Sequence, residues 1–182
     1  MFETLMTLPL FNGVSYARLS EIVGNTRLSF LKYLSGETFI SPDDPCDSLK
    51  FILSGKVRIS VSTRDDRFTV SSTLSAPSVI MPEYLYGRST VYPCKATAME
   101  ATSIMLIGKS DFTRLLSTDE IFLFNYLNLI SSNAQKSVEG VLALTSGSLE
   151  ERIAFWLVAL SQRESENIEL SCRQRDMCGV FG

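Results

Sequence analysis

The stretch Lys56-Val-Arg-Ile-Ser-Val-Ser62 decides the fold class, because its side chains alternate strictly between polar and apolar. Val57, Ile59 and Val61 fall on one face of an extended chain, and the charged and hydroxylated residues fall on the other. This period of two is typical of an antiparallel strand with one buried face. Arg64-Asp-Asp-Arg67 follows as a polar turn, and apolar residues then alternate again. The whole stretch predicts a β-hairpin.

Strand and turn signals continue on both sides of this hairpin, over about residues 28–108. Gly36 and Gly55 fall at strand-connecting turns, where a positive φ is expected. Ser103-Ile-Met-Leu-Ile107 is a more continuously apolar strand. Several short strands with regular turn signals predict an antiparallel β jelly roll, and helical patterns flank it. The fold class is therefore α+β.

Helix-start signals lie before and after this β region. Ser15 can cap a helix over Tyr16–Val23, with an apolar stripe formed by Leu19, Ile22 and Val23. In the last third, which reads as helical, three helix starts are predicted at Ser117 with Glu120, Ser148 with Glu151, and Ser171 with Gln174, the last opening Cys172–Phe181.

The helix predicted after Ser117 carries a narrow apolar seam. Spacings of three and four place six residues on it, namely Leu123, Leu127, Ile130, Ala134, Val138 and Val141. One interpretation is coiled-coil-like pairing with the same helix of a second copy. The other is packing against the chain's own β-domain. We expect pairing, and therefore a homodimer.

Composition excludes several classes of function. The chain of 182 residues has no histidine, which rules out Ser-His-Asp catalysis and histidine-ligated zinc or haem. The four cysteines are scattered without metal-binding spacing. We expect no catalytic residue, no metal site and no cofactor.

The net charge of −3 gives no strongly basic surface for nucleic acid. With neither a signal peptide nor a membrane-spanning run, a cytoplasmic location is expected.

Three stretches, in order, resemble the Crp/Fnr family of bacterial transcription regulators. Leu8–Val14 is similar to the segment that opens the family, and Lys32–Val61 is similar to its cyclic-nucleotide-binding jelly roll. Ser148–Ala154 and Leu170–Met177 are similar to the helix that follows and to the start of a winged helix-turn-helix. The resemblance implies a sensory domain whose effector biases a pair of long helices and thereby the spacing of two DNA-reading domains.

The resemblance also locates an effector pocket in Val79–Ala98. The family holds a cyclic phosphate with backbone N–H groups and an arginine, and a glutamate takes the ribose hydroxyl. Glu83 matches that glutamate, but Pro82 replaces a glycine, and Tyr92-Pro-Cys94 replaces the Arg-Ser-Ala motif. We therefore expect no response to cyclic AMP; the pocket takes another small molecule or none. The pocket candidates are Met81, Glu83, Tyr84, Arg88 as a displaced cation, Tyr92, Cys94 and Lys95 as a remaining cation.

These patterns divide the chain into three regions. Residues 1–116 are the expected sensory domain, 117–146 the dimerisation helix, and 147–182 the beginning of a truncated helix-turn-helix. The sequence stops at Gly182, directly after the first helix of that motif, so we expect the natural protein to continue and to contact DNA through the missing part. Arg173 and Arg175 are candidates for phosphate contacts. The 182 residues alone are not expected to bind DNA specifically.

The function that the sequence indicates is therefore non-enzymatic. We expect the effector-sensing and dimerisation portion of a Crp/Fnr-like regulator, with an unidentified small molecule, a second copy and DNA as partners, and no membrane. The alternative is a cyclic-nucleotide-binding regulatory domain that controls an enzyme or a channel. The start of a helix-turn-helix favours the first interpretation.

Overall fold

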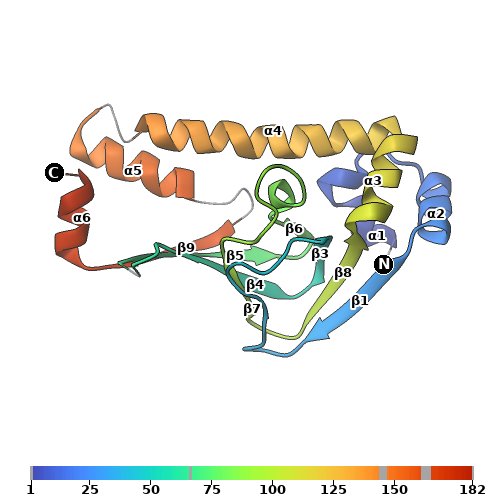
Figure 1. Ribbon diagram of the computed structural model, residues 1–182, viewed down its shortest axis with the longest axis horizontal. Coiled ribbons are helices and arrows are strands. Elements are labelled where there is room, and N and C mark those ends of the chain that lie inside the picture. The colour runs from blue at the N-terminus through green and yellow to red at the C-terminus, as the bar shows by residue number, and fades with distance from the viewer. Residues whose placement is uncertain (1, 66, 144–146, 161–164, 182) are drawn as a thin grey trace.

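Two antiparallel sheets pack into a jelly roll in the computed structural model, which describes residues 2–65, 67–143, 147–160 and 165–181 (Figure 1). One sheet has the strand order β1 (Leu28–Tyr33), β8 (Thr102–Gly108), β3 (Ser48–Ser54), β6 (Ser78–Ile80). The other has the order β2 (Thr38–Ile40), β7 (Lys95–Ala98), β4 (Lys56–Ser62), β5 (Phe68–Ser75), β9 (Ser165–Cys172). The predicted α+β jelly roll is confirmed.

The predicted hairpin is the β4–β5 pair, with Lys56 opposite Ser75 and Ser62 opposite Thr69. Its alternation places Val57 and Ile59 in the core, at 0% and 1% exposure, whereas Val61 near the turn is 37% exposed. Gly55 enters β4 with a φ of 90°. A Cβ there would lie 2.7 Å from the carbonyl oxygen of Ala101, so only glycine fits this turn.

Helices cover the roll at its ends and along one side (Figure 1). Three short elements precede β1 in the chain, namely α1 (Phe2–Met6), the 3-10 turn η1 (Pro9–Phe11) and α2 (Tyr16–Asn25). A second 3-10 turn, η2 (Pro82–Tyr84), follows β6. Four helices follow β8, namely α3 (Lys109–Thr118), α4 (Glu120–Ala143), α5 (Leu149–Leu160) and, after β9, α6 (Gln174–Phe181). Ser15 caps α2 as predicted, since its side chain accepts a hydrogen bond from the backbone N–H of Arg18. No helix in the described ranges combines the length and apolar content needed to cross a membrane.

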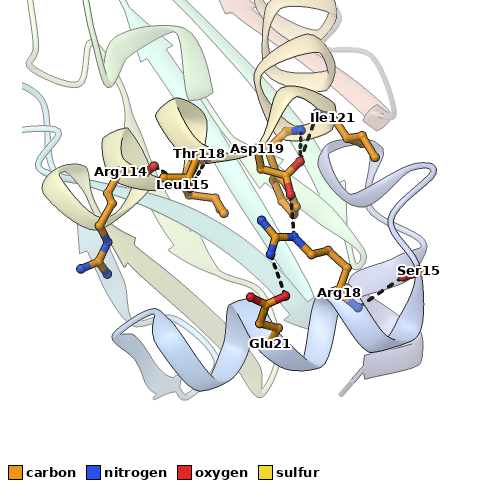
Figure 2. Close-up of polar contacts among 9 residues, drawn as sticks. Ser15, Arg18, Glu21, Arg114, Leu115, Thr118, Asp119 and Ile121 are labelled. Atoms are coloured by element: carbon orange, nitrogen blue, oxygen red, sulfur yellow. Dashed lines mark hydrogen bonds and ion pairs between the residues drawn. The ribbon is translucent and has the colours of Figure 1, made fainter.

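The start of the long helix differs from the prediction. Ser117 lies in the last turn of α3, and the residue that caps α4 is Asp119 (Figure 2). Asp119 Oδ1 accepts hydrogen bonds from the backbone N–H groups of Ile121 and Phe122, at 3.1 and 3.3 Å. Its Oδ2 accepts from Arg18 Nε of α2 at 2.8 Å. The carboxylate is preferred here because it satisfies two free donors at a positive helix end and also pairs with an arginine.

The second predicted capping box is confirmed. Glu151 Oε2 accepts from the backbone N–H of Ser148 at 2.8 Å, and Ser148 Oγ accepts from the backbone N–H of Glu151 at 3.3 Å. The two reciprocal bonds fix the start of α5.

The third predicted helix start is wrong in its position, and the last third is not wholly helical. Ser171 and Cys172 end strand β9, which pairs with β5 from Phe68 opposite Cys172 to Leu74 opposite Ser165. α6 starts only at Gln174. Part of the region predicted to begin a DNA-reading domain thus extends the second sheet. Edge pairing satisfies the backbone groups of both strands, which outweighs the local helix-start signal.

α4 presents two different faces. Phe122 and Tyr126 are buried, at 0% and 4% exposure, and pack on Phe11 and Phe112 with ring centroids 5.1 and 5.2 Å apart. The other face is solvent-exposed and apolar, with Leu123 at 40%, Phe124 at 66%, Leu127 at 46% and Val138 at 59%. Of the predicted seam, Ala134 is also exposed, Ile130 is partly buried against the core, and the side chain of Val141 lies outside the described residues.

Candidate effector site

The segment between β6 and β7 contacts α4 directly. Met81 adopts a left-handed conformation, with a φ of 40°, and turns the chain into η2. Tyr126 of α4 donates a buried hydrogen bond of 2.9 Å to the carbonyl of Pro82. Glu83 is exposed, and its Oε2 accepts from Asn133 Nδ2 of α4 at 3.1 Å. These two hydrogen bonds join the segment around η2 to α4.

Two polar side chains, those of Ser48 and Lys50, lie beside Tyr92, which is 1% exposed. Ser48 and Lys50 lie on one face of β3, two residues apart, and Lys50 Nζ donates to Ser48 Oγ at 3.0 Å and to Tyr92 Oη at 3.2 Å. Tyr92 Oη donates in turn to the carbonyl of Ser48 at 3.4 Å. Phe51, on the opposite face of β3, packs on Phe11 with ring centroids 5.9 Å apart. The polar cluster consequently lies on the side of β3 that faces the predicted cassette.

Burial shifts the protonation of this cluster toward neutral forms. Desolvation raises the pKa of Tyr92, and it raises the pKa of Cys94, which is 0% exposed, to about 12. Desolvation also raises the pKa of Cys46 and lowers the pKa of Lys50, the latter against the opposing charge of Asp47. Low-dielectric surroundings disfavour each charged form. The thiols at Cys46 and Cys94 are therefore poor nucleophiles.

The structure brings together only some of the predicted pocket residues. Met81, Tyr92 and Cys94 are buried, Tyr84 is half-buried with its pKa raised by desolvation, and Glu83 borders α4. Arg88 and Lys95 are exposed, and the described contacts do not join either to Tyr92. Neither predicted cation therefore lies at the centre of the cluster.

Lys50 is the cation that sequence reasoning missed. Its signal was a lysine inside Ser48-Leu-Lys-Phe-Ile-Leu-Ser54, a strand otherwise apolar at its centre. Tyr126 and Asn133 were missed as well, although an aromatic residue four positions after Phe122 indicates a second apolar face on α4.

With a lysine in place of an arginine, the site should bind a phosphate group less tightly. A lysine ammonium is a point charge, whereas an arginine binds phosphate oxygens in pairs. The ammonium here already donates to Ser48 and Tyr92. Within the described residues no group of three or more Cys, Asp or Glu could hold a metal ion.

Comparison with known proteins agrees with this geometry. The model of the family described as "Cyclic nucleotide-binding domain" matches residues 30–119. This stretch, just under half of the chain, therefore resembles that family, and its strands have the corresponding jelly-roll fold. No curated protein sequence matches the chain significantly.

Several solved structures share the fold at low identity. A transcriptional regulator from Thermotoga maritima is 20% identical, with a TM-score of 0.62 over 71% of this chain and 98% of the other. The catabolite activator protein from Thermus thermophilus is 13% identical, with a TM-score of 0.62 over 95% and 98%. A cAMP-binding acyltransferase from Mycobacterium smegmatis is 19% identical, with a TM-score of 0.57 over 75% and 41%. Two of these three structures are thus described as regulators, and one is an enzyme.

Proposed function

We propose that the chain is the effector-sensing and dimerisation portion of a Crp/Fnr-type transcription regulator that acts in the cytoplasm and does not respond to cyclic AMP. Residues 1–116 sense, 117–146 dimerise, and 147–182 lead into a DNA-reading domain. The observation that carries the proposal is the exposed apolar face of α4 (Leu123, Phe124, Leu127, Ala134 and Val138) beside a buried face that contacts the cassette. A soluble monomer rarely exposes such a contiguous face.

The proposed mechanism is a shift between two arrangements of the α4 pair. An effector at the cassette changes the position of η2, and the bonds from Tyr126 to Pro82 and from Asn133 to Glu83 transmit that change to α4. The effector works by binding one arrangement better than the other. Arg173 and Arg175, at the start of α6, would then contact phosphates of bound DNA.

The pairing face is tested by Leu127→Asp. Two carboxylates buried between paired helices are strongly unfavourable, so this variant should be monomeric by light scattering at concentrations where the wild type is dimeric. The matched control is Asn128→Asp, which adds a charge at an exposed neighbouring position outside the seam and should leave the dimer intact. A monomeric wild type, or a dimeric Leu127→Asp variant with native circular dichroism, would contradict the proposal.

The ligand preference is tested by calorimetric titration with cyclic AMP and cyclic GMP. Among the described residues, the contacts of Tyr92 include no arginine, and two prolines remove backbone donors, so we expect no binding in the micromolar range. Micromolar binding of either nucleotide would show that the Lys50 cluster replaces the missing arginine.

The acyltransferase neighbour favours a second function, a regulatory domain that controls an enzyme. That comparison covers 41% of the acyltransferase chain, so it concerns only part of that protein. A regulatory domain of this kind does not need an outward apolar face on α4. The light-scattering experiment therefore separates the two functions.

A further inference from the structure

One edge of the first sheet is open. β1 is the outermost strand of that sheet, and among the described strands it pairs only with β8 (Figure 1). In an edge strand, every second residue directs its N–H and C=O groups away from the sheet. Apart from the pairing with β8, the backbone hydrogen bonds of the described residues include none from Leu28–Tyr33. The outward groups of β1 can therefore pair with a further strand.

Large apolar side chains on both faces of β1 are exposed at this edge. Phe30 is 50% exposed, and Leu31, on the opposite face of the strand, is 43% exposed. Their partners across the β1–β8 pair, Met105 and Ile104, are 0% and 1% exposed. Both faces of the sheet are thus covered at β8, so Phe30 and Leu31 are exposed because β1 has no neighbour on its open side. An added strand would bury part of both side chains.

The other sheet edges are less suited to an added strand. β2 and β6 have three residues each, and short edge strands resist further pairing. β9 is longer, but its exposed residues within the described range are polar, namely Asn167, Glu169 and Ser171. β1 has six residues without proline or glycine, and its register with β8 is regular. It therefore has the length, regularity and apolar side chains that strand addition requires.

The charges at the open edge are positive. Arg27 directly precedes β1 and Lys32 belongs to it, and both are exposed. Neither takes part in an ion pair among the described residues. The first carboxylate after β1, that of Glu37, accepts a hydrogen bond from the backbone N–H of Leu34 within the following turn. An acidic segment would be attracted to this edge, whereas a second copy of β1 would add two further cations.

We propose that the open edge of β1 binds an extended acidic segment of a partner protein by strand addition. The backbone of the segment continues the sheet, its apolar residues cover Phe30 and Leu31, and its carboxylates pair with Arg27 and Lys32. Because these two cations are five positions apart, the recognised pattern has two acidic residues at the same spacing with apolar residues between them. This site is separate from the cassette and does not depend on the function proposed above.

The test is fluorescence anisotropy of the 182-residue protein with the labelled peptide Thr-Glu-Val-Phe-Thr-Val-Glu. Antiparallel pairing places its two glutamates opposite Lys32 and Arg27 and its phenylalanine opposite Phe30. We expect this acidic peptide to bind. The same peptide with both glutamates replaced by lysine should bind at least about tenfold more weakly.

Charge reversal on the protein tests the ionic contact. Lys32→Glu should weaken binding of the acidic peptide at least about tenfold. A peptide with lysine in place of the first glutamate should bind this variant better than the acidic peptide does, because the pair is restored with opposite signs. The matched control is Arg64→Glu, which makes the same change of charge at an exposed position on the β4–β5 turn and should bind normally.

Methylation of the peptide backbone tests strand addition. One peptide is N-methylated at alternate residues, and a second peptide at the residues between them. Only every second N–H group of an added strand faces β1, so one peptide should lose binding and the other should bind like the unmethylated peptide. Equal behaviour of the two methylated peptides would overturn the proposal.

Three further results would also overturn it. The first is absence of binding of the acidic peptide at millimolar concentration. The second is equal binding of the acidic and the lysine peptides to the wild type, a comparison that does not depend on any variant folding. The third is a species larger than the α4 dimer in light scattering that Phe30→Ser removes, since a second copy would then occupy the edge. Peptide binding does not involve the exposed face of α4, so the two proposals fail separately.

Discussion

Lys50 is a charged residue in the middle of a strand whose neighbours Leu49 and Phe51 are fully buried. Its amine is held by Ser48 and Tyr92, and desolvation lowers its pKa despite the nearby charge of Asp47. A lysine with a lowered pKa in the folded state binds fewer protons than in the unfolded state. Stability must therefore rise with pH between the folded-state pKa and the ordinary value of 10.5.

Replacing Lys50 with methionine removes this pH dependence. As the pH rises toward the ordinary lysine value of 10.5, the free energy of unfolding of the wild type should increase relative to that of Lys50→Met. Urea denaturation at several pH values measures the difference. Lys95→Met removes an exposed lysine and should keep the wild-type slope. Parallel curves for the wild type and Lys50→Met would show that the lysine is not desolvated.

Single residues could be predicted where their reason is local. Ser15, Ser148 and Gly55 follow from capping and turn chemistry, and each lies where the sequence placed it. Lys50 and Tyr92 could not be paired, because they are 42 positions apart and meet only through the folding of the roll. Arg88 and Lys95 were predicted as the cations of the effector pocket from their positions in the sequence. Those positions do not reveal that both side chains are exposed to solvent.

At the scale of the element, the residue that caps α4 also attaches this helix to α2. Asp119, only 8% exposed, caps α4 with one oxygen and pairs with Arg18 of α2 through the other (Figure 2). Arg18 also pairs with Glu21 at 2.7 Å, which orients the guanidinium. The carboxylate thus fixes both the start of the helix and its position.

Asp119→Ala should therefore destabilise the protein. Losing a helix cap costs about 1–2 kcal/mol, and the loss of the Arg18 pair adds to it. Asp119→Asn keeps an oxygen for the cap and should lose less. Urea denaturation at neutral pH provides both values. An Asp119→Ala variant as stable as the wild type would show that the cap contributes nothing.

Elements were predictable where the hydrophobic period is strong. The alternation in β4 and the apolar spacing in α4 each indicate the right element type. β9 was missed because its eight residues are stabilised by pairing with β5, a contact between segments about 100 positions apart. Such tertiary pairing leaves only a weak local signal.

At the scale of the whole molecule, α4 links the parts. Figure 1 shows it running along one side of the roll, from α3 to the end near α5. Its buried face follows from the aromatic contacts with Phe11 and Phe112, and its outer face is apolar and uncovered. The sequence predicted one apolar seam. In the structure, one side of the helix packs against the roll, and Leu127 and Val138 on the other side are exposed to solvent.

Cross-linking of α4 between two copies tests this account most directly. In a background with Cys172 and Cys178 replaced by serine, Ala134→Cys places a thiol on the exposed seam, and Gln135→Cys places one beside it, off the seam. Paired helices with axes about 8–10 Å apart bring the two seam thiols close enough for a disulfide. We expect a covalent dimer on a non-reducing gel for Ala134→Cys and little for Gln135→Cys. A monomer band for both variants, or equal cross-linking of both, would contradict the pairing of α4.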